Sequence, residues 1–315
     1  MNTAVRVAVC SRSFSNNPVL RAELLARYQH VTFNDGGLQL KGDSLIEFLQ
    51  GHGKAITGLE LIDEYVLTRL PELKVISKYG VGLDMIDTAA MCAHGKRLGW
   101  TGGVNRRSVS ELVISFAIAM LRHVPAAYRE VLSGTWHQHV GGHLSGRTVG
   151  IIGCGHIGKD LVKLLKGFDC PILVNDIRDY PDFYVANDIE AVSLEELLER
   201  SDIVTLHVPL DESTRCMLDA QRLALLKPAA VLINLARGEL VDEMALKHML
   251  KDQRLAAAAF DVFAVEPPQD KELLSLPNFL VTPHLGGSAH EAILAMGRAA
   301  IVGLDVNHIP SGDLK

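Results

Sequence analysis

The sequence predicts an α/β protein of two domains, each built on a doubly wound parallel sheet. Short β-branched apolar runs alternate with helical patterns from one end of the chain to the other, which is typical of parallel sheets joined by helices. The chain has 315 residues, and a single hydrophobic core rarely grows that large. Two domains are therefore expected.

The composition is that of a globular protein, with 48% hydrophobic and 22% charged residues. A net charge of −6 disfavours nucleic acid as a partner, and no apolar run approaches the roughly 20 residues that a membrane helix needs. The N-terminal "AVRVAVC" is too short for a signal core and indicates a buried strand. The five cysteines are scattered and form no C-x-x-C pair, which predicts reduced thiols and a cytoplasmic location.

The apolar runs place the elements in order. In the first hundred residues the candidate strands are 6–11, 54–57 and 74–80, separated by helical stretches at 19–28, 43–49 and 62–70. A mostly apolar segment, 108–132, is long enough to connect the two domains as a helix. A second strand series follows at 147–153, 171–176, 202–209, 229–236, 255–263 and 278–284. Ser193 and Glu196 form a capping box that predicts a helix start.

A glycine-rich turn follows the first strand of the second series. Gly153, Gly155 and Gly158 have the G-x-G-x-x-G spacing of a dinucleotide site. The first glycine permits a tight turn, the second lets backbone approach a pyrophosphate, and the third lets helix and strand pack closely. This context predicts a Rossmann-like domain, although a structural turn without a ligand has the same spacing.

Asp176 ends the next strand, 18 residues after Gly158. A carboxylate at this place accepts hydrogen bonds from the ribose hydroxyls and repels a 2′-phosphate, so NAD is the expected cofactor. Arg178 follows two residues later and leaves NADP open as the alternative.

Three polar residues come at, or just after, the carboxyl ends of later strands, where open parallel sheets bind ligands: Arg237, Glu266 and His284. Histidine transfers protons near neutral pH, and a carboxylate on its other ring nitrogen fixes the tautomer and favours the protonated form. Arginine binds a carboxylate with two parallel hydrogen bonds. Together they predict hydride transfer at a carbon that bears oxygen, although each residue alone is more often an ordinary surface or loop residue.

With these residues the chain resembles the D-isomer-specific 2-hydroxyacid dehydrogenase family over almost its whole length. "LPELKVISKYGVGLDMID" looks like the family's substrate loop, and "GGVNRRSVSELVISFAIAMLR" resembles its interdomain helix. "SGTWHQHVGGHLSGRTVGIIGCGHIG" resembles its entry into the cofactor domain. The resemblance implies two Rossmann-like or flavodoxin-like domains with the active site in the cleft between them. It assigns 1–101 plus 286–315 to substrate binding and 102–285 to NAD.

The resemblance also implies residue roles. His284 would be the acid/base and Glu266 its partner, while Arg237 would bind and polarise the substrate. Lys78 and the backbone at Val81 and Gly82 would face the substrate from the first domain. The cofactor would be lined by Gly153, Gly155, His156, Ile157, Gly158, Asp176, His207, Val208, Pro209, Thr214, Leu235, Ala236, Asp261 and Gly287.

The substrate is implied only as a class, a small 2-hydroxy or 2-keto acid. Thr57 and Gly58 stand where phosphoglycerate-specific relatives are expected to carry an arginine. Glyoxylate, hydroxypyruvate and pyruvate therefore stay open beside phosphoglycerate. Asn105, Arg106 and Arg107 are more basic than the family pattern and contact either solvent or a ligand.

Three histidines, His137, His139 and His143, lie within seven residues of one another. No matching acid or cysteine pair adjoins them in the sequence, so we expect no metal site here. The segment resembles the family's dimer arm, which implies a homodimer. Trp136 would either reach a partner subunit or anchor the arm by burial.

Two other function classes remain open. An NAD(H)-binding scaffold or co-repressor can use the same fold and retain the same three residues. A dehydrogenase of another small oxyanion, such as formate or phosphite, is the second alternative. Formate dehydrogenases of this fold carry glutamine where Glu266 stands, which argues against formate.

Overall fold

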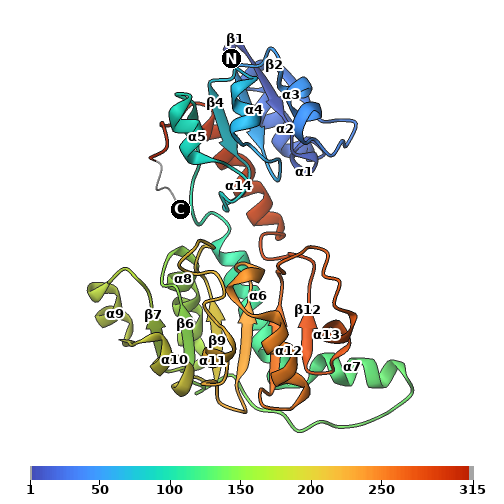
Figure 1. Ribbon diagram of the computed structural model, residues 1–315, viewed down its shortest axis with the longest axis vertical. Coiled ribbons are helices and arrows are strands. Elements are labelled where there is room, and N and C mark those ends of the chain that lie inside the picture. Colours follow the sequence, from blue (N-terminus) through green and yellow to red (C-terminus); the bar gives the residue numbers. More distant parts are fainter. Residues whose placement is uncertain (1, 312–315) are drawn as a thin grey trace. The chain divides into compact units, whose positions relative to one another are not determined.

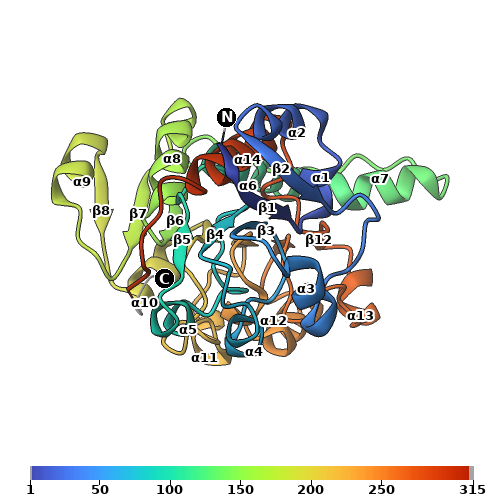
Figure 2. The ribbon, with the colours of Figure 1, turned by 90° about the horizontal axis from the view of Figure 1, so that it is seen from above.

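The computed structural model describes residues 2–311. The chain forms two compact units, one comprising Met1–Asn105 and Ala289–Lys315 and the other Arg106–Ser288. The predicted boundaries at 101/102 and 285/286 lie within a few residues of these divisions. Figures 1 and 2 show the sheet of each unit with helices on both of its faces. The predicted α/β class with two parallel sheets is confirmed.

The first unit contains a five-stranded parallel sheet in the order β2-β1-β3-β4-β5. Its strands are β1 (Asn2–Val9), β2 (Tyr28–Phe33), β3 (Lys54–Thr57), β4 (Val75–Lys78) and β5 (Arg97–Gly99). Its helices are α1 (Arg12–Ser15), α2 (Pro18–Leu25), α3 (Gly42–Leu49), α4 (Glu64–Thr68), α5 (Thr88–Ala93) and α14 (His290–Gly303).

Alternate residues of β1 separate the two cores of this unit. Ala8 and Cys10 face the core that contains α3, α4 and α5, while Val7 and Val9 face the core that contains α2 and α14. Figure 2 shows these two helix groups on opposite sides of the sheet. A sheet covered on both faces is the expected form of a parallel sheet, because its connections place helices there.

The last helix returns to the first unit. The Ser77 hydroxyl of β4 donates to the Ala300 carbonyl of α14 at 2.7 Å. A Cβ on Gly99 would lie 2.2 Å from the Gly303 carbonyl oxygen, so helix and strand approach closely only because both residues are glycine. The backbone of His308 then forms an antiparallel bridge to Leu98. These contacts tie residues after Ala289 to β4 and β5.

The second unit contains a seven-stranded parallel sheet in the order β12-β11-β10-β9-β6-β7-β8. Its strands are β6 (Val149–Ile152), β7 (Ile172–Asn175), β8 (Ile189–Ala191), β9 (Ile203–Leu206), β10 (Val231–Asn234), β11 (Ala257–Phe260) and β12 (Phe279–Val281). Its α-helices are α6 (Arg106–Leu121), α7 (Val124–Leu132), α8 (His156–Leu165), α9 (Pro181–Asn187), α10 (Leu194–Arg200), α11 (Ala220–Leu223), α12 (Glu243–Lys251) and α13 (Lys271–Ser275). Two 3₁₀ turns, η1 (Lys166–Phe168) and η2 (Gly238–Leu240), complete it.

Two apolar cores again cover the faces of this sheet. One contains residues of α6, α8 and α9, and the other contains residues of α10, α11 and α12. The predicted start of α10 is confirmed, because the Ser193 hydroxyl accepts from the Glu196 backbone N–H at 3.2 Å. The Glu196 carboxylate pairs with Arg200 at 2.6 Å.

Three strands were missing from the sequence prediction: β2, β5 and β8. All three lie at an edge of their sheet. Edge strands are short and half-exposed, so their side chains need not be apolar on either face. The sequence of β2, "YQHVTF", is accordingly half polar, and its residues after Tyr28 are at least partly exposed.

The single connecting helix predicted for 108–132 is wrong, because the structure divides it into α6 and α7 with a bend of 63°. His123 adopts a left-handed conformation with φ of 55°, and Pro125, in the first turn of the next helix, has no N–H to donate to the preceding turn. No single helix within residues 2–311 is long and apolar enough to cross a membrane, and only the bent pair α6–α7 reaches that length and hydropathy.

Candidate active site

Arg237, Glu266 and His284 lie beyond the ends of three adjacent strands, β10, β11 and β12. The strands are parallel, so their carboxyl ends meet at one edge of the sheet. His284 and Glu266 are in direct contact there. The His284 Nδ1 atom lies 3.0 Å from Glu266 Oε2, and about half of the imidazole surface is exposed.

The second oxygen of Glu266 is also engaged. Oε1 accepts a hydrogen bond from the Phe263 backbone N–H at 3.2 Å. A carboxylate held at both oxygens presents a fixed acceptor to the imidazole. Because an ionised carboxylate can only accept, the hydrogen of the His284–Glu266 bond belongs to Nδ1. Nε2 is then the ring nitrogen that can exchange a proton with a ligand.

The turn that carries His284 is organised by Asp261, a residue with 1% of its surface exposed. Its carboxylate accepts from the Leu285 N–H at 2.6 Å, from the Gly286 N–H at 2.7 Å, and from the Thr282 hydroxyl. His284 has a left-handed backbone with φ of 55°, a conformation that costs a non-glycine residue about 1 kcal/mol. The buried carboxylate holds the backbone in this form and thereby fixes the imidazole.

Arg237 is positioned by Asn234, the last residue of β10. The fully buried Asn234 amide donates to the Arg237 carbonyl at 2.8 Å and accepts from the Ala236 N–H at 3.1 Å. The Arg237 guanidinium is half-buried and donates from Nη1 to the Ala236 carbonyl at 2.6 Å. Asn234 was not among the residues predicted from the sequence. An asparagine at the end of a strand does not by itself indicate that its side chain bonds to the backbone of the next turn.

Gly238 joins the arginine segment to the loop that carries Glu266. A Cβ at this position would lie 2.0 Å from the Phe263 carbonyl carbon and 2.1 Å from the Ala264 nitrogen. The two backbones therefore touch, and only glycine fits between them. This contact keeps the Arg237 and Glu266 segments in register.

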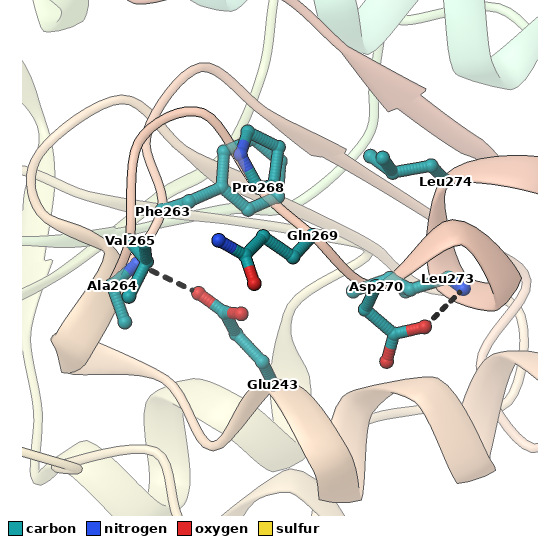
Figure 3. Close-up of a pocket in the computed structure, with 9 residues that line it drawn as sticks. All are labelled: Glu243, Phe263, Ala264, Val265, Pro268, Gln269, Asp270, Leu273 and Leu274. Carbon is teal, nitrogen blue, oxygen red and sulfur yellow. Dashed lines mark hydrogen bonds between the residues drawn. The ribbon is translucent and has the colours of Figure 1, made fainter.

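The same loop is fastened to α12. The Glu243 carboxylate accepts from the Ala264 N–H at 2.9 Å, beside a pocket of about 210 Å³ that runs from Glu243 and Phe263 to Leu274 (Figure 3). None of Arg237, Glu266 and His284 lines this pocket. The pocket lies between the loop and α12 and is distinct from the candidate active site.

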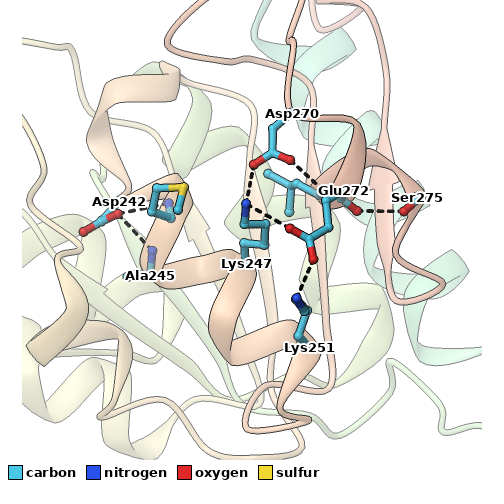
Figure 4. A network of polar contacts seen from close by, with 9 residues as sticks. Asp242, Ala245, Lys247, Lys251, Asp270, Glu272 and Ser275 are labelled. Atoms are coloured by element: carbon cyan, nitrogen blue, oxygen red, sulfur yellow. Dashed lines mark hydrogen bonds and ion pairs between the residues drawn. The ribbon is translucent and has the colours of Figure 1, made fainter.

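An ion-pair network continues this support (Figure 4). Lys247 of α12 contacts Asp270 at 2.7 Å and Glu272 at 3.3 Å, and Lys251 also pairs with Glu272. The hydrogen bond from Lys247 lowers the pKa of Asp270. Asp270 also caps α13 by accepting from the Leu273 N–H at 3.0 Å. The loop between β11 and α13 is thus held at both ends.

The glycine-rich turn fits a dinucleotide. A Cβ on Gly153 would lie 2.7 Å from the His207 carbonyl oxygen, and one on Gly158 would lie 2.2 Å from the Gly153 carbonyl oxygen. A Cβ on Gly155 would meet nothing within 4 Å. The first and third glycines are thus required by the protein's own packing, whereas the second leaves open space at the start of α8, where a helix N-terminus attracts phosphate.

Asp176 lies next to this turn. Its Oδ2 accepts from the Cys154 N–H at 2.6 Å and its Oδ1 from the Arg178 N–H at 2.8 Å. Each oxygen keeps a second acceptor site for a hydroxyl. Burial raises the pKa of Cys154, between the first two glycines, to about 11, so this residue stays a neutral thiol beside the phosphate position.

His207, which follows β9, has a buried polar atom without a partner. Its Nε2 lies 3.0 Å from the Thr205 hydroxyl, while Nδ1 has no hydrogen bond within the protein. Burial lowers the pKa of His207 to about 3, so the ring is neutral. Thr214 closes the following loop by donating to the Pro209 carbonyl at 2.8 Å. A neutral ring with an unsatisfied nitrogen at this edge fits a bound polar ligand.

The substrate residues expected in the first unit are held by backbone contacts. The Lys78 side chain is buried, and its Nζ donates to the Gly58 carbonyl. The Val81 carbonyl accepts from the Trp100 indole N–H at 2.9 Å, which fixes the loop before Gly82. Trp100 was not among the sequence-predicted residues, since a single indole after a short strand carries no pattern.

Arg107 does not point to a ligand. Its guanidinium forms a bidentate pair with Asp160 of α8, with distances of 2.9 and 3.0 Å. It therefore fastens α6 to the helix that follows the glycine-rich turn.

The expectation that no acid accompanies the histidines near 137 is wrong. Glu130 of α7 lies 2.8 Å from His139 Nε2 and 3.7 Å from His137 Nδ1. The sequence hid this contact because the chain reverses direction between the acid and the histidines.

Comparison with known proteins identifies relatives of the chain. Residues 114–286 match the model of the D-isomer specific 2-hydroxyacid dehydrogenase, NAD binding domain. Glyoxylate reductase of Thermococcus litoralis is 36% identical over 80% of this chain and 78% of the relative. D-3-phosphoglycerate dehydrogenase of Methanocaldococcus jannaschii is 38% identical over 79% of this chain but only 48% of the relative, so the chain spans about half the length of that protein.

Solved structures show the same architecture. A structure from Polaromonas sp. JS6 66, assigned to the same family, superposes with a TM-score of 0.87 at 31% identity and covers 96% of this chain and 95% of that one. Pyruvate reductase of Chlamydomonas reinhardtii gives 0.79 at 28% identity, with 95% of each chain covered. The second unit is thus an NAD or NADP binding domain, and the chain belongs to the D-isomer specific 2-hydroxyacid dehydrogenase family of oxidoreductases.

Proposed function

We propose that the protein interconverts a small D-2-hydroxy acid and its 2-keto acid with NAD(H) as cofactor. The observation that carries this proposal is the 3.0 Å contact between His284 and Glu266 at the strand edge that also presents Arg237. An imidazole oriented by a carboxylate can move a proton to or from a substrate oxygen. A bound nicotinamide supplies or accepts the hydride.

In the reducing direction, His284 donates a proton from Nε2 to the oxygen of the keto group. The negative charge of Glu266 stabilises the imidazolium that is present before this transfer. In the oxidising direction the same nitrogen takes the proton from the hydroxyl group. Glu266 stays ionised in both directions, and its second hydrogen bond from Phe263 keeps it in place.

Arg237 binds the substrate. Its guanidinium has five N–H donors in a planar fork that matches a carboxylate, and one of them already bonds to the Ala236 carbonyl. This fork would hold the substrate carboxylate and polarise the adjacent carbonyl. Backbone N–H groups near Val81 and Gly82 are the donors expected from the first unit, whereas the Lys78 ammonium donates to the Gly58 carbonyl.

NAD is favoured over NADP because of Asp176. Its carboxylate stands beside the glycine-rich turn, where a 2′-phosphate would meet a negative charge. The Arg178 side chain is exposed, so its ion pair with a 2′-phosphate would be weakened by solvent and would add little binding free energy. The backbone and side chains of the other lining residues complete the cofactor site, with Asp261 and Gly287 at the nicotinamide end.

The substrate is proposed to be small and unphosphorylated. Thr57 and Gly58 offer no cation for a phosphate, and the buried Lys78 ammonium is directed to the Gly58 carbonyl. The similarity to a glyoxylate reductase over 78% of that relative points the same way. Glyoxylate, hydroxypyruvate and pyruvate are the candidates to compare.

The protein is proposed to act as a homodimer in the cytoplasm. Apolar side chains on α7 and the segment after it are 50–94% exposed, namely Val124, Tyr128, Val131, Leu132, Trp136 and Val140. A patch of this kind is typical of a subunit interface. The cysteines are free, which suits a reducing compartment.

The test is a spectrophotometric screen of 2-keto acids with NADH and, in parallel, NADPH. We expect oxidation of NADH with at least one of glyoxylate, hydroxypyruvate and pyruvate, and slower oxidation of NADPH. Formate and phosphite, offered with NAD, serve as the comparison for another oxyanion. Inactivity across the panel, with NADH binding retained in a fluorescence titration, would contradict the proposal and favour a cofactor-binding scaffold.

A further inference from the structure

We infer that Glu130, His137 and His139 form a binding site for a divalent transition metal ion, with Zn²⁺ as the best match. One ligand atom from each residue, Glu130 Oε2, His137 Nδ1 and His139 Nε2, lies within 4.8 Å of the other two. Two imidazoles and a carboxylate are a ligand set that Zn²⁺ uses with a fourth position left open to water.

The Glu130–His139 contact is a hydrogen bond, and the spacing of the three ligand atoms also allows them to share a metal ion. Glu130 Oε2 is 2.8 Å from His139 Nε2 and 3.7 Å from His137 Nδ1. Ligand atoms about 2.0–2.1 Å from a tetrahedral Zn²⁺ are separated from one another by about 3.3 Å. The two distances bracket this value, and the two imidazole nitrogens lie within 4.8 Å of each other, so modest side-chain shifts would complete the site.

The local fold explains why these side chains meet. Gly134 has a φ of 86° and ends α7, and the Thr135 N–H then bonds to the Glu130 carbonyl at 2.9 Å. This is the reversal expected at a helix end with a left-handed glycine. The chain returns alongside the last turn of α7, and side chains two residues apart in an extended segment share one side. His137 and His139 therefore both face Glu130.

The far end of the returning segment is also fixed. The Gly142 N–H donates to the Leu121 carbonyl at 3.0 Å, and a Cβ on Gly141 would lie 2.3 Å from that oxygen. Residues 135–143 have no regular secondary structure, yet both of their ends are anchored to the helices. The ligand atoms are thus brought together before any ion binds, and an ion would clip the segment to α7.

The site is separate from the proposed active site. Arg129, next to Glu130, donates to the Leu276 and Pro277 carbonyls at 3.1 and 3.2 Å, immediately before β12 begins. His284 follows the opposite end of β12. The metal site therefore lies near the amino end of β12, and the proton-transfer residues lie beyond its carboxyl end. The inference does not depend on the proposed function.

Calorimetric titration of the chelator-treated protein with ZnCl₂ tests the inference. A Cys92→Ser, Cys216→Ser background removes the exposed thiols, which also bind Zn²⁺. We expect one Zn²⁺ per chain and at least a tenfold loss of affinity in His137→Ala and in His139→Ala. His94→Ala is the matched control. His94 makes a 2.9 Å contact with Glu64 in the first unit, and that pair contains one imidazole where the proposed metal site has two.

Tryptophan fluorescence gives an independent readout. In a Trp100→Phe background, Trp136 is the remaining tryptophan and is next to His137 in sequence. Co²⁺ should quench its emission, and His139→Ala should abolish the quenching. Absence of binding by the starting protein, or an unchanged Zn²⁺ affinity in a folded His137→Ala, His139→Ala double variant, would overturn the inference.

Discussion

His284 Nδ1 lies 3.0 Å from Glu266 Oε2, although 17 residues separate the two in the sequence. The contact forms because His284 follows β12 and Glu266 follows the neighbouring strand β11. One end of the imidazole is thereby fixed by a carboxylate, and the other end is available for proton exchange.

Replacement of His284 by alanine should reduce turnover by roughly 10²–10⁴, because the substrate oxygen loses its proton donor. NADH binding, measured by fluorescence, should remain almost unchanged. Alanine is strained at the φ of 55° found here, so His284→Asn, which tolerates that conformation, is the control for the backbone. Turnover of either variant at the level of the unmodified protein would end the acid/base assignment.

Glu266→Gln should lower turnover less than His284→Ala, on the order of 10-fold to 100-fold. The amide oxygen can still accept from Nδ1, but the amide NH2 then faces the Phe263 N–H. The imidazole thus keeps an acceptor and loses the charge that stabilises the imidazolium. Steady-state rates of both variants in one buffer series measure this difference. A loss equal to that of His284→Ala would mean that Glu266 transfers the proton itself.

Arg237→Lys should lower kcat/KM for the keto acid by about 10-fold to 100-fold, because a lysine cannot form two parallel bonds to a carboxylate. The cofactor KM should change little. Arg215→Lys, at an exposed pair with Glu239, is the matched control and should behave as the unmodified protein. An unchanged dependence on keto acid concentration in Arg237→Lys would exclude substrate binding by this residue.

Asp176→Ala should raise the KM for NADH. The ratio of kcat/KM with NADH to kcat/KM with NADPH should fall, to below one if the preference reverses. This variant removes the carboxylate that we propose to bond the ribose hydroxyls and repel a 2′-phosphate. Asp179→Ala, an exposed acid three residues later, controls for the change in net charge. A preference of the unmodified protein for NADPH would refute the assignment of NAD.

The three glycines of the cofactor turn should respond differently to alanine. Gly158→Ala should destabilise the fold by about 1–3 kcal/mol, because its Cβ would meet the Gly153 carbonyl at 2.2 Å. Gly155→Ala should keep its melting temperature but bind NADH weakly, since its Cβ would fill the space open to the pyrophosphate. Calorimetry and NADH titration of both variants separate these outcomes. Tight NADH binding by Gly155→Ala would place the pyrophosphate elsewhere.

The sequence alone predicted the elements whose residues are buried on both faces. Strands such as β6, β9 and β10 are continuous apolar runs, because helices cover both sides of the sheet. The edge strands β2, β5 and β8 gave no such signal. The break between α6 and α7 at His123 was also missed, because the residue type does not reveal that this histidine adopts a left-handed backbone conformation.

The candidate catalytic residues were recognisable in the sequence because each follows a strand, and the ends of parallel strands meet at one edge. Their supports were not. Asn234 acts on the backbone of the turn that follows it, and Asp261 and Glu243 act on backbone atoms of other segments. Backbone hydrogen bonds of this kind leave no trace in residue spacing. Of these residues, only Asp261 was singled out, and for a different role.

The sequence by itself thus determined the α/β class, the glycine turn and the order of the polar residues at strand ends. Those properties depend on local periodicity and chain order, which a sequence records directly. Only the tertiary structure decided which side chains touch. Glu266 reaches His284 because two strands are neighbours, and Glu130 reaches His139 because Gly134 reverses the chain. Contacts of this kind depend on which segments the folded chain brings together.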